Sequence, residues 1–306
     1  MAQQARGYKS AMVIDFESSF GVAPGTKKGV ALPMNSNDLS KAQTLIESDT
    51  ITGTRNDTQP ALGRVSVDGD IEMPADYVSA GYMLKALFGS PKTTGTTANK
   101  THVFTVKDNQ PSIIVEKAFP DLGKYIRYKG VKINTFSVDY GQDSEMTFKY
   151  NVMGASREQD GTAYDSAAKA AKLLRIAQNH AYVKIDGAES RIVKEGSLEI
   201  NANLDGDQYV VGGGGLRGDI PEGLMKVSGS LKALFTSTEW MDKADTGTAA
   251  SMEIGFKLDE NTSLVFAMPT VQFEPFDAQI SSPAGVVVDV KWRAFSADGK
   301  SIVTVT

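Results

Sequence analysis

Residues 130–154 have the sequence GVKINTFSVDYGQDSEMTFKYNVMG, which is the pattern of a β-hairpin and decides the fold. In the second arm, apolar and polar side chains alternate from residue 145 to residue 152, the two-residue period of a strand with one apolar and one polar face. The first arm alternates as well, but its apolar phase changes near Asn134 and Thr135, and this change predicts a β-bulge. Residues 141–143 supply the turn between the arms.

The same plan returns in the C-terminal half of the chain. Residues 270–279 and 286–293 repeat the two alternating arms, and the second arm lies 140 residues after its counterpart. Residues 225–231, around Gly229, match a segment around Gly69 at an offset of 160. This repetition predicts an internal duplication.

A helix candidate follows each glycine-centred segment. The first covers residues 74–88, with Pro74 in the first helical position and apolar side chains at helical spacing up to Phe88. The second covers residues 236–243 and contains Trp240. Four elements in one order, each present twice, are the basis of the predicted duplication.

The duplication divides the chain into three parts. We expect a first β domain at residues 1–155, a connecting segment at residues 156–180 and a second β domain at residues 181–306. The connecting segment is expected to be partly helical, because SAAKAAKLLRIAQ at residues 166–178 is rich in strong helix formers. The fold class is therefore mainly β, with sandwich or partial-barrel sheets and a flanking helix in each of two tandem copies.

Composition excludes several classes of protein. The 306 residues are 41% hydrophobic and carry a net charge of −5, which is the wrong balance for a protein that grips nucleic acid. Cysteine is absent, so disulfides and thiolate metal sites are excluded. No run of eighteen apolar residues predicts a membrane span, and the first twenty residues do not have the pattern of a signal peptide.

No motif points to catalysis, a cofactor or a metal. The glycines at 212–215 lack the lysine and the Ser or Thr that a phosphate-binding loop needs. His102 and His180 have no partner at metal-ligand spacing, and the Asp pairs at 68/70 and 205/207 fit turns as well as calcium. Residues 217–219 spell Arg-Gly-Asp, a cell-adhesion tripeptide that recurs by accident. We expect no enzyme activity.

Taken in order, four segments resemble the tail tube (major tail) proteins of long-tailed bacteriophages, of the duplicated two-domain type. They are DFESSFGVAPG at 15–25, GRVSVDGDI at 63–71, the hairpin at 130–154, and IPEGLMKVSGSL at 220–231. The resemblance implies two tail-tube-like domains in a structural virion protein whose rings stack into a hollow tube for DNA delivery. It also implies synthesis in the host bacterial cytoplasm and no membrane partner. The implied partners are other copies of the chain, the tape measure protein, the tail tip or baseplate and the tail terminator, with DNA passing transiently and without specific binding.

Two hypotheses follow from this resemblance. Two copies per chain predict homotrimeric rings with pseudo-sixfold symmetry, the alternative being a homohexamer. The polar faces of the two hairpins are predicted to line the lumen, although the bulge leaves open which face points inward. The predicted lumen residues are Ser137, Asp139, Glu145, Thr147, Lys149, Asn151, Gln272, Glu274, Asp289 and Lys291.

Long loops at residues 26–62, 92–100 and 205–217 are expected to carry contacts between stacked rings. A second class of function stays open, namely a duplicated β-sandwich binding module for cell-surface or carbohydrate recognition. Such a module needs a cluster of exposed aromatic side chains, for which Tyr209 and Trp240 are the candidates. The sequence does not separate a contractile from a non-contractile tail.

Overall fold

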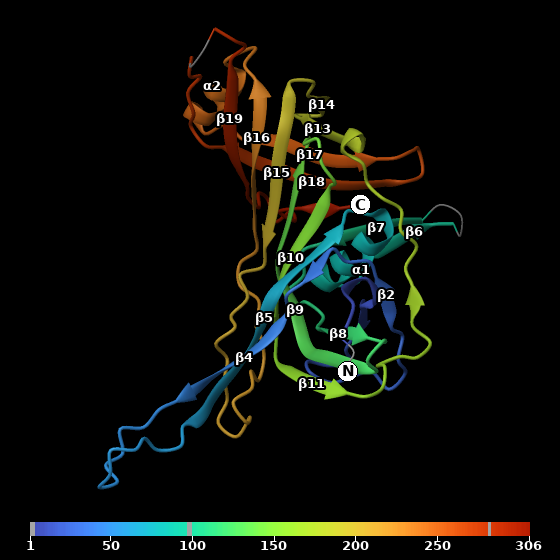
Figure 1. Ribbon diagram of the computed structural model, residues 1–306. Helices are drawn as coiled ribbons and strands as arrows, with labels where there is room; N and C mark the ends of the chain where they lie inside the picture. Colours follow the sequence, from blue (N-terminus) through green and yellow to red (C-terminus); the bar gives the residue numbers. More distant parts are fainter. Residues whose placement is uncertain (1–3, 97–99, 281–282) are drawn as a thin grey trace.

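The computed structural model describes residues 4–96, 100–280 and 283–306 (Figure 1). Within these ranges the chain is mainly β, as the alternating pattern predicted. The first half contains η1 (Gly7–Lys9), β1 (Ala11–Phe16), β2 (Val30–Leu32), β3 (Ser36–Asn37), β4 (Ser40–Ile46), β5 (Ala61–Pro74), α1 (Tyr77–Phe88), β6 (Lys92–Gly95), β7 (Lys100–Thr105), β8 (Ile113–Phe119), β9 (Lys124–Tyr140) and β10 (Thr147–Gly154).

A middle segment and a second half follow. The middle segment contains β11 (Ser156–Asp160), β12 (Lys169–Ala170) and η2 (Gln178–His180). The second half contains β13 (Ala181–Ile185), β14 (Ala188–Glu189), β15 (Val193–Asn201), β16 (Lys226–Leu234), α2 (Glu239–Thr246), β17 (Ala250–Lys257), β18 (Ser263–Phe273), β19 (Val287–Ala294) and β20 (Thr304–Val305).

The predicted hairpin at residues 130–154 is confirmed. Strands β9 and β10 pair antiparallel around a turn, and their buried side chains alternate with polar ones. Asn151 pairs with Thr135, whereas Val152 pairs with Ile133, so Asn134 is an extra residue on β9. The bulge predicted from the change of phase is therefore confirmed as well.

Both halves use the same order of strand pairings. In the first half β4 pairs with β5, β5 with β10, β10 with β9, β9 with β8, and β8 with β1. In the second half the same positions are taken by β15, β16, β19, β18, β17 and β13. Val152 lies opposite Gly69, and Trp292 lies opposite Gly229, which reproduces the sequence offsets of 140 and 160. The domain limits at residues 155 and 181 stay a prediction.

Strands β9 and β15 join the two halves into one continuous sheet. Their antiparallel register runs from Tyr140 opposite Gly196 to Thr135 opposite Asn201. One hydrophobic cluster extends through both halves, and the ring of Phe136 on β9 stacks on that of Phe266 on β18 at a centroid distance of 5.6 Å. No local pattern in the sequence predicts this pairing.

Helices α1 and α2 lie on the apolar side of this sheet, in contact with β9 and β18 respectively. The side chain of Asp76 caps α1 by accepting the amides of Val78 and Ser79, both at 2.8 Å. The expected start at Pro74 is wrong, because Pro74 is the last residue of β5. Helix α2 begins at Glu239, three residues later than expected, and ends at Thr246, where Gly247 caps it in the left-handed conformation.

The helix expected over residues 166–178 is wrong. Lys169 and Ala170 form β12, which pairs with β2, and only Gln178–His180 is helical, as a short 3-10 turn. The segment lies along the first half, where the amide of Ile176 donates to the carbonyl of Ala75 at 2.8 Å. Hydrogen bonds to partners distant in sequence therefore outweigh the helix propensity of the alanines and lysines.

Two of the expected loops contain strands. Residues 92–100 form parts of β6 and β7, which pair as a hairpin, so the expected loop is wrong at both ends, while residues 97–99 lie outside the described residues. Residues 26–62 contain the short strands β2 and β3, and then β4 and β5 form a long hairpin that projects from the body of the molecule (Figure 1). None of the helices in the described part of the chain is long and apolar enough to cross a membrane.

A substitution at Gly229 tests the register of β15 against β16. A Cβ at Gly229 would lie 2.0 Å from the carbonyl oxygen of Ser197, so Gly229→Ala should lower the free energy of unfolding by about 1–3 kcal/mol. At Gly81 in α1, a Cβ meets no heavy atom of the described residues within 4 Å, so Gly81→Ala should raise it by about 0.5–1 kcal/mol. Urea denaturation measures both variants, and a Gly229→Ala protein as stable as the wild type would contradict the register.

Candidate functional site

The solvent face of the continuous sheet is the candidate site. All ten predicted lumen residues lie on this face or at its margin, and none is buried. Their sequence neighbours, such as Phe148 and Trp292, point to the other side and fill the core. The structure therefore brings the polar faces of the two hairpins together in one surface.

A row of polar residues crosses this face from one half to the other. Each residue in the row is the registered partner of the next, across eight strands from β3 to β18. The row consists of Ser36, Glu72, Lys149, Ser137, Glu199, Ser228, Arg293 and Gln272. Glu72, Glu199 and Arg293 were missed by the sequence analysis. Their alternation is visible in the sequence, but only the pairing of β9 with β15 places them beside the predicted residues.

Carboxylates outnumber cations on the polar face. Surface ion pairs offset part of the charge, as between Arg293 and Glu274 at 2.9 Å and between Arg175 and Glu145 at 3.4 Å. Such exposed pairs contribute about 0–1 kcal/mol each, so they shape the surface potential more than the stability. The acids are Asp38, Asp68, Asp70, Glu72, Asp139, Glu145, Glu195, Glu199, Glu274 and Asp289, against Lys149, Arg175, Lys226, Lys232, Lys291 and Arg293.

The buried side chain of Arg217 fixes the loop between β15 and β16 to the first half. Its guanidinium group donates to the carbonyl oxygens of Val67 at 3.1 Å and Gly154 at 3.0 Å, and to Asp68 at 2.8 Å. Burial acts to lower the pKa of Arg217, but the hydrogen bond and charge of Asp68 outweigh it and raise that pKa. Only 8% of Arg217 is exposed, so the arginine of the Arg-Gly-Asp tripeptide has a structural role here.

A second buried cation, Lys132, also holds this loop. Lys132 on β9 donates to the carbonyl oxygen of Ile220 and to the carboxylate of Glu222, both at 2.8 Å. Glu222 also accepts the backbone amide of Gln110 at 2.8 Å. The loop that leaves the second half is thus tied to the first half at two places, neither of which the sequence motifs indicated.

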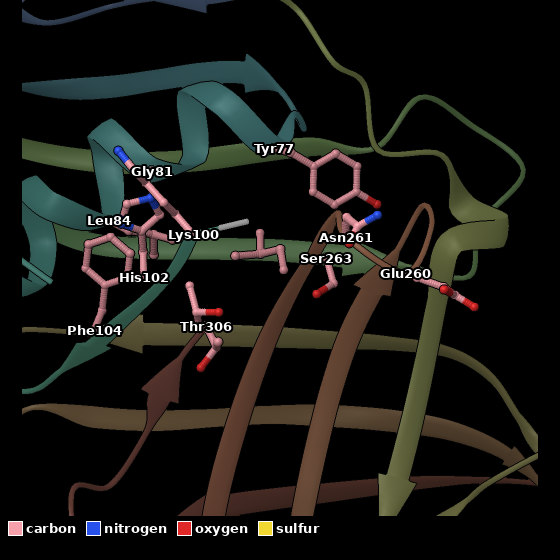
Figure 2. Close-up of a pocket in the computed structure, with 12 residues that line it drawn as sticks. Tyr77, Gly81, Leu84, Lys100, His102, Phe104, Glu260, Asn261, Ser263 and Thr306 are labelled. Atoms are coloured by element: carbon pink, nitrogen blue, oxygen red, sulfur yellow. The ribbon is translucent and has the colours of Figure 1, made fainter. Parts of the chain in front are cut away.

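A pocket of about 270 Å³ lies where α1 meets the turn between β17 and β18 (Figure 2). Tyr77 borders it, and burial together with the charge of Asp259 raises the pKa of Tyr77 to about 12. Of the two histidines, His180 hydrogen-bonds Tyr77 and His102 hydrogen-bonds Thr93. Among the described residues, no three His, Asp or Glu side chains are grouped so that they could hold a metal ion.

Tyr209 and Trp240, the two aromatic candidates for a binding module, pack against different neighbours. Tyr209 lies beside Arg64 and donates its hydroxyl to the carbonyl oxygen of Val65 at 3.2 Å. Trp240 on α2 stacks on Phe273, with ring centroids 5.9 Å apart. Each ring therefore packs against its own neighbours, and this gives no support for an aromatic recognition cluster.

Comparison with known proteins gives one family. The model of a family described as phage tail tube protein matches residues 7–294, from the first residue of η1 to the last residue of β19. The match therefore includes both halves and the pairing of β9 with β15. A search of curated proteins found no match.

Removing the guanidinium group of Arg217 tests its role in holding the loop. Arg217→Ala leaves the carbonyl groups of Val67 and Gly154 without their donor, so the free energy of unfolding should fall by about 1–3 kcal/mol. Amide hydrogen exchange at residues 205–221 should become faster. The matched control is Arg191→Ala, at an exposed position, which should change neither quantity. Unchanged exchange in Arg217→Ala would show that other contacts hold the loop.

Proposed function

Because the chain belongs to the phage tail tube protein family, a family of structural tail proteins, we propose that its copies form rings that stack into the hollow tail tube. DNA passes through this tube into the host cell. The protein is made in the host bacterial cytoplasm and becomes part of the virion tail. Its partners are its own copies, the tape measure protein, the tail tip or baseplate and the tail terminator.

The observation that supports this proposal most directly is the continuous sheet. It has a polar face on one side and the core with both helices on the other. In the part of the chain that the structure describes, β4 pairs only with β5, which leaves its outer edge free, and residues 274–280 after β18 belong to no strand. Unpaired edges are templates for further strands, and closure into a ring removes them.

The repeated pairings support two ring units in each chain. Three chains then supply six similar units, which gives a homotrimeric ring with pseudo-sixfold symmetry. The duplication at residues 1–155 and 181–306 is part of this proposal. A homohexamer, in which only one unit per chain lies in the inner wall, is the alternative.

The polar face lines the lumen in this proposal, because the opposite face is covered by α1 and α2. Its carboxylates repel the phosphates of DNA weakly, and this repulsion prevents tight binding that would stall passage. The lining consists of the ten predicted residues together with Glu72, Glu199 and Arg293.

Stacking contacts are assigned to two segments with exposed apolar side chains. They are the hairpin of β4 and β5 and the loop between β15 and β16, which project toward the same end of the molecule (Figure 1). Because exposed apolar patches mark interaction surfaces, these segments fit contacts with the next ring. The apolar side chains are Leu45, Ile46, Ile51 and Leu62 in the hairpin and Val210, Val211 and Leu224 in the loop.

Electron microscopy of the purified protein at high concentration tests the assembly. Wild-type protein should form rings and tubes whose top view shows six similar units from three chains. Because Ile51 is 96% exposed and Val211 is fully exposed, the variant Ile51→Asp with Val211→Asp should form rings that do not stack. A wild-type protein that stays monomeric, even when a tail tip is supplied, would refute the proposed function, and full-length tubes of the variant would refute the stacking surface.

Reversal of charges on the polar face tests the lumen. Asp139→Lys, Glu199→Lys and Asp289→Lys together should make assembled tubes retain short duplex DNA at least about tenfold more strongly at low salt, with retention falling as salt rises. A control with Glu189→Lys, Asp245→Lys and Glu260→Lys changes the net charge equally at exposed positions away from this face. Equal retention by the two sets of tubes would place the polar face outside the lumen.

A further inference from the structure

We propose that residues 37–42 of one copy pair antiparallel with residues 275–280 of the next copy, in the register that joins β15 to β9 within the chain. The inference rests on the proposed ring and names the two edges that close it. The partner is a second copy of this chain, because the proposed contact between copies repeats the contact between β9 and β15 within one chain.

A glycine opposite a buried leucine in each half shows which residues of β4 and β15 are equivalent. A Cβ at Gly69 would lie 2.5 Å from Cα of Leu39, and Gly229 is the registered partner of Leu198. Leu39 and Leu198 are both fully buried. Ser40 pairs with Asp68 on β5, and Glu199 pairs with Ser228 on β16 in the same way. Each residue of β4 in this region therefore corresponds to the residue of β15 that lies 159 positions later in the sequence.

The segment that ends β18 and continues to residue 280 corresponds to β9 at an offset of 140 residues. Ile133 on β9 pairs with Val152, and Phe273 on β18 pairs with Trp292. The partly buried Phe276 packs on the core, as the equivalent Phe136 does. Residues 275–280 are therefore the counterpart of residues 135–140, the segment of β9 that pairs with β15.

Exposure differs sharply between these equivalent positions. Tyr140 is 2% exposed beside β15, whereas its counterpart Ile280 is 84% exposed. The isolated chain thus leaves an apolar side chain exposed at Ile280, in a position that the contact between the halves buries in Tyr140.

The backbone amides fit the same register. The amide of Ala202 donates to the carbonyl of Asn134 at 2.8 Å, so alternate residues of β9, beginning with Phe136, direct their amides toward β15. The counterparts of these donors are residues 276, 278 and 280, which all carry an N–H group. Pro275, which has none, occupies a position whose amide faces β19 instead.

Side chains satisfy part of the first edge in the isolated chain. The amide of Leu39 donates to the side chain of Asn37 at 3.2 Å, and the carbonyl of Asn37 accepts Lys117 at 2.6 Å. A strand from the next copy would replace these two bonds with backbone pairing. These two hydrogen bonds therefore protect the β4 edge from nonspecific strand pairing until a strand with the matching register binds.

Engineered cysteines test this register directly, because the chain contains no cysteine of its own. Ser40 and Asp277 correspond to Glu199 and Ser137, a pair without direct backbone hydrogen bonds, whose Cα atoms lie about 4.5 Å apart. That separation suits a disulfide. Mild oxidation of assembled Ser40→Cys/Asp277→Cys protein should replace the monomer band on a non-reducing gel with covalent oligomers, ending at the number of chains in a ring.

Three controls make the outcome decisive. Glu199→Cys/Ser137→Cys should form a disulfide within the chain, and Ser40→Cys/Gln272→Cys should form none between chains, because its register is wrong. If Ser40→Cys alone gives dimers, two β4 edges pair with each other and the proposal is overturned. If rings form and the Glu199/Ser137 control links while Ser40/Asp277 does not, the proposal is overturned and the tube function stands. If the wild type forms no rings, the proposed function itself fails.

Discussion

The antiparallel pairing of β9 with β15 is the constraint on which the rest of the structure depends. It places Phe136 and Val138 of the first half beside Leu198 and Ile200 of the second, all four of them buried. The hydrogen bonds between these strands turn two half-sheets into one surface, with a single core behind it and a single polar face in front. Because neighbouring side chains in a strand point to opposite faces, a shift of one residue here would exchange the two faces.

The buried cations Arg217 and Lys132 strengthen the same contact from outside the sheet. Each gives its hydrogen-bond donors to backbone carbonyls as well as to a carboxylate. Burial of such charges costs free energy unless they are fully bonded, so both sites depend on correct docking of the loop between β15 and β16. The two halves are therefore joined by one sheet and by the two buried cations that hold the loop.

Local pattern predicted much of the fold, and long-range pairing explains most of what it missed. The bulge at Asn134 and the sequence offset between Gly69 and Gly229 could be predicted, because each depends on a pattern that covers only a few neighbouring residues. The helix expected at residues 166–178 was wrong because that segment hydrogen-bonds to residues more than ninety positions away. The ten candidate residues share one face as alternation predicts, but Glu199 joins them only through pairing that no local pattern encodes.

The covalent link between the two halves has a kinetic consequence for assembly. The contact between β9 and β15 forms within one molecule, at an effective concentration on the order of millimolar that dilution does not reduce. Contacts between molecules instead depend on how much protein the cell has made. In the proposed ring, with two units in each chain, half of the lateral contacts would be complete when each chain has folded, and the number of units would be even. The rate of synthesis would then control assembly only through the remaining half of the contacts.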